Sequence, residues 1–219
     1  ANPALQLANK TVSFSFTSGG STSAKTNDVG FTTAPYTATA SAGSYQLTGT
    51  FAGDATYAST SVVVALNVIK RDCYVTGVNV STKVLDVFVA SATLQDFHTD
   101  GLVSGKTIKF SLLTSSMPAV TNGVGLGTAA FTAPSSSGPY SLYSQFLGDA
   151  TYNPSPVSTN TLTLARRNGT IALSATPNAV ISSSIPMTAT MLDAVDSRYI
   201  VGRTVSFLFQ GSTQTSNTQ

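Results

Sequence analysis

The chain has 219 residues, of which 42% are hydrophobic and only 9% are charged, and its formal net charge is +2. This length holds one large domain or two smaller ones with packed cores, and the hydrophobic share argues against disorder. The small charge without a basic stripe gives no support for nucleic acid as a partner. Val, Thr, Phe and Tyr are abundant while Glu is absent, which favours strands over helices.

The first recognisable elements are strands. Residues 10–16, KTVSFSF, alternate apolar and polar side chains, as a half-buried strand does. A turn-like TFAGDATY follows at residues 50–57, and VVVALNVI at residues 62–69 is the longest apolar stretch. That stretch has the length of a strand and falls far short of the roughly 18 apolar residues of a membrane span. We therefore predict no membrane-spanning segment.

The middle of the chain continues this pattern. Runs that alternate or are mostly apolar, joined by Gly, Pro, Asn and Asp, predict six or seven short strands. The runs lie at residues 74–80, 83–94, 106–112, 125–133, 139–148 and 157–165. Within one of them, Ile108, Phe110 and Leu112 share a face. Because no helix is evident, these runs predict an antiparallel β-sandwich.

Several segments recur at one period. Gly53 and Gly148, in two copies of the Phe-x-Gly-Asp-Ala-Thr-Tyr motif, are 95 residues apart. KTVSFSF (10–16) returns as KTIKFSL (106–112), 96 residues later, and as RTVSFLF (203–209), a further 97 residues on. ASATLQD and MTATMLD are also 97 residues apart. The agreement of independent segments predicts a tandem repeat.

The period divides the chain into three units. We predict an incomplete first unit at 1–72, which lacks its first strands, and a complete middle unit at 73–168. The third unit, 169–219, is also incomplete and lacks its last strands. Short linkers at 69–72 and 165–168 predict neighbours that touch and flex only modestly. The chain starts with Ala and without a signal-like segment, which favours a processed mature protein or an excised piece.

The repeated FxGDATY motif is predicted to form a corner that joins the two sheets. Gly permits the backbone turn, and Asp can bond nearby backbone N–H groups in an Asx-type turn. Tyr57 and Tyr152 are expected to cover the open end of the core, with their hydroxyls bonded to the backbone. The alternative is a calcium site at Asp54 or Asp149, but one carboxylate per copy is few for an ion that takes about 6–8 oxygens.

These segments resemble bacterial Ig-like repeat domains. The order GKTIKF, NGVG, SSGPYSLYSQFLGDATYNPS, LTL follows the pattern of that family, and residues 41–61 fit it almost position for position. The resemblance extends over all three units, although the truncated outer units depart from it. It implies all-β, tandem immunoglobulin-like antiparallel β-sandwiches in an extracellular or cell-surface protein. It brings no catalytic residues and no cofactor.

Residues that could support catalysis are few. His98, the only His, lies in a loop-like stretch beside Asp96 and Asp100, without a Gly-x-Ser-x-Gly motif, and is predicted to be solvated. Cys73, the only Cys, is predicted to be a buried and inert thiol, and the alternative is a disulfide link to another chain. Zinc would need more His or Cys ligands than the chain has. We therefore predict a protein that is not an enzyme and has no catalytic, cofactor or metal site.

The function predicted from the sequence is structural. We expect a non-enzymatic extracellular protein of a surface layer, appendage or filament, with further copies or neighbouring repeats as partners. The third unit carries early strands that the first lacks, so chains could join by strand complementation, although both end units contain the TVSF strand. The alternative arrangement is that these residues are a window from a longer polypeptide.

Two further interpretations concern surface residues. The alternative function is a carbohydrate- or ligand-binding adhesin module, whose partner would be a cell-surface glycan or another surface protein, with Tyr74 or Tyr143 as stacking side chains. The basic pairs at 70–71 and 166–167 recur, with Arg71 matched to Arg166. They are predicted to solvate the junctions between units; the alternative is contact with an acidic neighbour.

Overall fold

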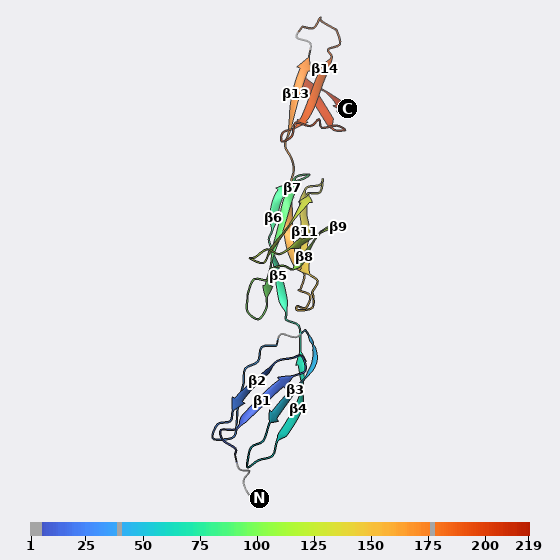
Figure 1. Cartoon of the computed structure of the whole chain (residues 1–219). Helices are drawn as coiled ribbons and strands as arrows, with labels where there is room; N and C mark the ends of the chain where they lie inside the picture. The colour runs from blue at the N-terminus through green and yellow to red at the C-terminus, as the bar shows by residue number, and fades with distance from the viewer. Residues whose placement is uncertain (1–5, 39–40, 176–177) are drawn as a thin grey trace.

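The computed structural model describes residues 6–38, 41–175 and 178–219, and the regular structure in this part is strand. Within the same residues, no helix is long and apolar enough to cross a membrane. Figure 1 shows three groups of strands that follow one another along one direction, with β1–β4 at one end and β13–β16 at the other. The arrangement is that of an elongated chain of β-units.

The middle unit is an immunoglobulin-like sandwich of two layers. Its strands are β5 (Cys73–Gly77), β6 (Val80–Lys83), β7 (Val87–Asp96), β8 (Thr107–Leu112), β9 (Ser115–Val120), β10 (Leu126–Thr132), β11 (Gly138–Phe146) and β12 (Ser158–Ala165). One layer has the order β10-β7-β5 and the other the order β6-β12-β11-β8-β9. The ladders are antiparallel except that between β6 and β12, which is parallel.

The strands differ from the sequence-based prediction in three places. The predicted strand at 74–80 is divided, because β5 ends at Gly77 and β6 begins at Val80 in the opposite layer. β7 begins only at Val87, after Leu85 adopts a left-handed backbone with φ of 65°. The sequence predicted no strand between β8 and β10, but β9 forms there by pairing with β8. Its residues SSMPAV do not alternate, so the neighbouring strand rather than its own pattern specifies it.

The two layers of the middle unit enclose a packed core. Ile108, Phe110 and Leu112, predicted to share one face of a strand, are all buried, with 3% exposure or less. They lie in the same core cluster as Phe88 and Phe131, whose rings stack with centroids 6.0 Å apart. The alternating pattern of this strand is therefore confirmed by burial on one layer face.

The first unit is one sheet without a second layer. Its strands β1 (Thr11–Phe16), β2 (Ser21–Lys25), β3 (Gly43–Phe51) and β4 (Thr60–Val68) have the order β2-β1-β3-β4. Pairing places Phe16, Leu47 and Val64 in one row across the sheet. The matching face of β8, β11 and β12 is buried in the middle unit, whereas none of the described residues of the first unit is buried. Its apolar face is therefore largely open, although the ring of Tyr36 stacks on Phe16 with centroids 3.5 Å apart.

The third unit holds two separate pairs of strands. β13 (Gly169–Ala175) pairs with β14 (Met187–Asp193), and β15 (Thr204–Phe209) pairs with β16 (Ser212–Asn217). By position in the repeat, they match β5, β7, β8 and β9 of the middle unit. Val205 is the one buried hydrophobic residue among the described residues of this unit, while Ile171 and Leu173 are 59% and 66% exposed. Its inner faces are thus mostly uncovered.

Candidate functional site

The two copies of FxGDATY form the same turn. In the middle unit, Asp149 Oδ1 accepts hydrogen bonds from the backbone N–H groups of Thr151 (2.7 Å) and Tyr152 (2.9 Å). In the first unit, Asp54 Oδ1 accepts the equivalent bonds from residues 56 and 57, at 2.8 and 2.9 Å. The glycine before the aspartate has a positive φ, and a Cβ at Gly148 would lie 2.9 Å from Pro154, in the loop before β12. The predicted Asx-type turn is confirmed, but the prediction that it joins the two sheets is wrong, because it connects β11 to β12, and β3 to β4, which pair with each other in one sheet.

The hydrogen bonds of the tyrosines differ from the prediction. Tyr152 packs against the core as expected, but its hydroxyl lies beside the carboxylate of Asp96 rather than a backbone group. The hydroxyl-to-backbone bonds belong to other tyrosines: Tyr45 donates to the carbonyl of Ser41 at 2.7 Å, and Tyr140 donates four residues back at 3.0 Å. These two resemble the tyrosine corner of immunoglobulin-like sandwiches, which ties a strand to the loop before it.

A lysine completes each corner. Lys106 Nζ lies 2.5 Å from Asp149 Oδ2 and 5.7 Å from the centre of the Tyr152 ring. Lys10 makes the same contacts in the first unit, with Asp54 at 2.5 Å and the Tyr57 ring at 5.3 Å. The lysine therefore ties the start of one strand to the corner before the last strand of its sheet, through an ion pair and a cation–π contact.

The pKa values of both corner aspartates are lowered in the folded chain. The hydrogen bond from Lys10 is the largest cause that lowers the pKa of Asp54 to about 2. Partial burial alone raises the pKa of Asp149, but Lys106 and the two backbone N–H groups outweigh it and lower the pKa to about 2. Both oxygens of each carboxylate already accept hydrogen bonds, so few oxygen lone pairs remain to coordinate a Ca²⁺ ion. Within the described residues, no group of three or more His, Cys or Asp side chains gathers in a way that could hold a metal ion.

The junction before the middle unit contains an ion pair between an exposed arginine and a buried aspartate, which the sequence analysis missed. Arg71 donates two hydrogen bonds to Asp96, from Nε at 2.5 Å and from a terminal nitrogen at 2.9 Å, and the Asp96 side chain is 4% exposed. The bond from Arg71 is the main cause that holds the pKa of Asp96 well below its usual value, against the opposing effect of burial. The N–H groups of His98 and Thr99 also bond Asp96. Arg71 thus fixes the loop that follows β7.

The next junction repeats this arrangement and extends it. Arg167 lies 3.2 Å from Asp193 and 3.4 Å from Asp196 of the third unit. It also lies 3.5 Å from Asp86, in the turn between β6 and β7 of the middle unit. One guanidinium with a 14% exposed side chain therefore connects two units through three carboxylates.

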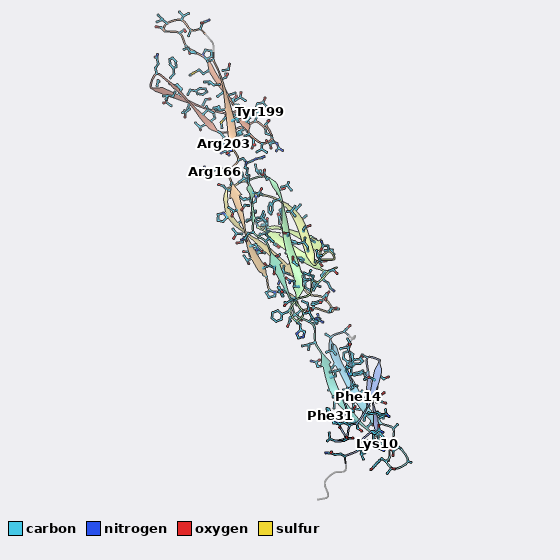
Figure 2. All side chains as sticks on the ribbon, turned by 90° about the vertical axis from the view of Figure 1, so that its left-hand side faces the viewer. Lys10, Phe14, Phe31, Arg166, Tyr199 and Arg203 are labelled. Carbon is cyan, nitrogen blue, oxygen red and sulfur yellow. The ribbon has the colours of Figure 1, made fainter. Side chains whose placement is uncertain are left out.

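These contacts correct the interpretation of the basic pairs. Arg71 and Arg167 are bound to carboxylates of this chain, so they do not simply solvate the junctions. Because both bind the aspartate that ends the second repeat strand, Arg71 matches Arg167 and not Arg166. Figure 2 places Arg166 and Arg203 near each other at the second junction. They line a hollow of about 640 Å³ and have no ion-pair partner among the described residues. Arg203 matches Lys106 of the middle unit by its position in the repeat.

The only His and the only Cys are placed as predicted. His98 is exposed in the turn after β7, and the nearby carboxylates serve other groups: Asp96 binds Arg71, and Asp100 accepts a bond from the Tyr74 hydroxyl at 3.1 Å. Cys73 is 3% exposed, and its thiol contacts the carbonyl of Asn153 at 3.3 Å. Burial is the main cause that raises the pKa of this thiol, which keeps it protonated and unreactive.

The two tyrosines proposed to stack on a sugar lie apart in the fold. Tyr74 belongs to β5 in one layer, where its ring meets Phe97 edge to face at 6.4 Å. Tyr143 belongs to β11 in the other layer and is 42% exposed. Because they belong to opposite layers, these two rings do not form one stacking platform.

Comparisons with known proteins find structural matches among large adhesins. No protein-family model matches the chain, and no curated protein does so at a significant level. Among solved structures, a tetra-tandem repeat from the extending region of a large adhesion protein matches 98% of this chain with 13% identity and a TM-score of 0.40. The chain spans 56% of that structure.

Two other solved structures match to a similar degree. One comes from work on the host cell surface retention of a 1.5-MDa bacterial ice-binding adhesin, with 11% identity, a TM-score of 0.33, and coverage of 97% of this chain and 73% of that one. The other is a Ca²⁺-stabilized adhesin of an ice-binding Antarctic bacterium, with 13% identity, a TM-score of 0.29, and coverage of 99% and 56%. The chain is thus similar to tandem repeat regions of large bacterial adhesins.

Proposed function

We propose that this chain is a non-catalytic, load-bearing spacer of an extracellular surface protein, built from units at 1–72, 73–168 and 169–219. The observation that carries the proposal is the parallel pairing of β6 with β12. The linker that enters the middle unit leads through β5 into β6, and β12 precedes the linker that leaves the unit at the opposite end (Figure 1). A pull along the chain draws these strands in opposite directions.

Such a pull loads the ladder in shear. Four residue pairs join the two strands, from Val80 opposite Leu162 to Lys83 opposite Ala165, and the N–H of Val84 adds a bond to the carbonyl of Ala165 at 3.0 Å. Bonds that lie across the direction of force must break together, whereas bonds at a peeled end break one at a time. The middle unit therefore has the geometry of a module that resists extension.

Force spectroscopy on the whole chain, held at its two ends, tests the spacer function. We expect Val84→Pro to unfold the middle unit at a lower force than Val84→Ala, because proline removes the N–H that bonds Ala165. Both variants lose the buried valine side chain, so Val84→Ala is the matched control for the core. Equal unfolding forces for the two variants would show that the β6–β12 ladder does not bear the load.

The assembly into a filament or layer is a finer proposal. The open sheet of the first unit and the uncovered strands of the third unit are apolar surfaces that cost free energy in water. We infer that copies associate through these end units by strand complementation. The exposed valines of β4 and the exposed apolar residues of β13 support this inference.

A further inference from the structure

We propose that the middle unit binds a neutral saccharide at one end of its β10-β7-β5 layer, where the rings of Phe97 and Tyr74 form a stacking surface. This aromatic patch consists of Tyr74, Gln95, Phe97, Asp100 and Leu102. It lies at the end of the middle unit where the linker from the first unit enters β5 (Figure 1). The proposal goes beyond the spacer function, because a spacer needs no ligand.

Strand pairing places the patch on the outer face of the layer. Gln95 of β7 lies opposite Tyr74 of β5, and on its other side it forms an isolated bridge with Leu102. The neighbouring residues Cys73 and Leu94 are buried in the core, so Tyr74 and Gln95 point away from it. The three side chains therefore form one row across the outer face.

Phe97 is exposed although its loop is held in place. Its side chain is 70% exposed, and its ring meets the Tyr74 ring edge to face with centroids 6.4 Å apart. Its N–H donates to the carbonyl of Asp72 at 3.0 Å, and Asp96 accepts the N–H groups of the two residues that follow. Together with Leu102, which is 53% exposed, this ring presents a fixed apolar surface to water, as binding loops do.

The loop does not need an aromatic side chain in order to fold. The third unit forms the same loop after β14, where Asp193 accepts the N–H of the second residue after it at 2.8 Å, as Asp96 does at 2.9 Å in the middle unit. Ala194 occupies the position of Phe97 in that loop. The ring of Phe97 is therefore additional to what the turn requires, which points to a role outside folding.

Neither its own unit nor a neighbouring one covers the patch. In the middle unit, Phe97 is exposed beside both layers of its own sandwich. At the second junction, a unit with both layers precedes the matching loop. The positions that match Tyr74 and Phe97 hold Thr170 and Ala194 there, and both are exposed. The exposure of the patch is therefore independent of whether the first unit has one layer or two.

The side chains around the rings favour a neutral, hydroxylated ligand. All outward-facing residues of β5, β7 and β10 are uncharged. One oxygen of Asp100 accepts the Tyr74 hydroxyl at 3.1 Å, and the other accepts no hydrogen bond from the described residues, so it can accept one from a sugar hydroxyl. The amide of Gln95 can both donate and accept. The C–H groups on one face of a sugar ring pack against an aromatic ring, while such polar groups fix its orientation.

The size of the patch also favours a saccharide over a protein partner. A stable protein interface takes about 20–30 residues from each side. The patch offers three apolar side chains, those of Tyr74, Phe97 and Leu102, and the next row of the layer consists of the hydroxyls of Thr76 and Thr93. A surface of one or two rings bordered by hydroxyl groups matches the dimensions of a sugar ring.

A glycan array of neutral, sialylated and sulfated oligosaccharides, probed with the whole chain, tests the proposal. We expect signals on neutral glycans, and binding weaker by about tenfold or more for Phe97→Ala and for Tyr74→Thr, because each removes a ring. Both substitutions introduce the residue of the third unit, so the loop should still form and the midpoint of urea unfolding should stay close to that of the unmodified chain. Phe97→Tyr should keep binding, since it keeps the ring.

The matched control is Tyr143→Thr, which removes an exposed ring from the opposite layer and should bind as the unmodified chain does. A neutral glycan selected on the array should shift the NMR amide signals of residues 95–102 and leave those of β8 and β11 in place. Signals on acidic glycans alone, no signal on any glycan, or equal binding by Phe97→Ala would overturn the proposal.

A protein partner at the patch would overturn it as well. In that case light scattering would give a mass that rises with concentration for the unmodified chain and stays constant for Phe97→Ala, which would assign the patch to a second copy. None of these outcomes affects the force measurement, which tests the spacer function separately.

Discussion

The aspartate of each corner combines two roles in one carboxylate. Its Oδ1 receives the backbone N–H groups that define the turn, and its Oδ2 receives the lysine that holds the neighbouring strand. Asparagine would keep the first role, because its side-chain oxygen accepts the same bonds, but it would lose the charge that attracts Lys106. The two roles can therefore be separated by one substitution.

Acid should destabilise the middle unit through these groups. The pKa of Asp149 is about 2 in the folded chain against an ordinary value of 3.8, so folding favours the ionised form. The resulting stabilisation is complete above about pH 4 and is lost as pH falls toward 2. We expect the free energy of unfolding, measured by urea titration at a series of pH values, to drop in this window.

Asp149→Asn should make that drop smaller and cost about 1 kcal/mol at neutral pH, as expected for an ion pair that is only partly exposed to solvent. Asp100→Asn is the control, because Asp100 accepts a bond from Tyr74 but pairs with no cation in the described residues. A pH profile of Asp149→Asn identical to that of the unmodified chain would contradict the role assigned to this carboxylate.

Single residues show where sequence reasoning succeeds and where it fails. The burial of Cys73, the exposure of His98 and the Asp-centred turn follow from residue type and local order, so they were predictable. The pairing of Arg71 with Asp96 joins residues 25 positions apart and was missed. A signal was present, since an arginine in the linker and an aspartate ending ASATLQD both recur one period later, as Arg167 and Asp193.

Linkers between the units are elements with structure of their own. Arg71 exchanges backbone hydrogen bonds with residues 151 and 153, both at 2.9 Å, so the linker adds an isolated parallel bridge to the corner of the middle unit. At the next junction, Arg167 contacts carboxylates on both sides. The second linker is therefore cross-linked to both neighbours by ion pairs, which limits how the third unit can rotate.

Removing that cross-link should loosen the second junction. We expect Arg167→Ala to broaden the distribution of distances between labels placed on the middle and third units, measured by electron paramagnetic resonance. Arg166→Ala is the matched control, because the adjacent arginine has no carboxylate partner in the described part of the chain. Asp86→Asn should reproduce part of the effect, since it removes only the contact to the middle unit. Equal distance distributions for the two arginine variants would show that the ion pairs of Arg167 do not restrain the junction.

At the level of elements, the periodicity of the sequence predicted where most strands form. It did not predict which of the two layers each strand joins. The face of β8 that carries Ile108 and Phe110 follows from alternation alone, and the structure buries it. The change of layer between β5 and β6 could not be predicted, because it depends on which strands compete for the edges of the two sheets. Strand β9 was missed for the same reason, since its pairing partner rather than its own sequence makes it a strand.

Across the whole molecule, burial is concentrated in one unit. Of the buried hydrophobic residues in the described part of the chain, all but Val205 lie between Cys73 and Leu164. Each fully buried large side chain contributes roughly 1.5–3 kcal/mol to folding, so the middle unit holds most of the hydrophobic stabilisation. The outer units have equivalent strands, but their apolar faces meet water in a single chain.

This distribution predicts two levels of stability in dilute solution, where chains are separate. We expect native-state hydrogen exchange to give high protection for the central strands β7, β8 and β11, set by global unfolding of the middle unit, and much lower protection for β1–β4 and β13–β16. Because the corner and its lysine are the same in the first and middle units, the comparison isolates the effect of the missing layer. Leu162→Ala should cost the middle unit about 2–5 kcal/mol and leave exchange in β1–β4 unchanged. Uniform protection along the chain would mean that an open sheet is as stable as a closed sandwich, which burial of Phe110 against exposure of Val62 argues against.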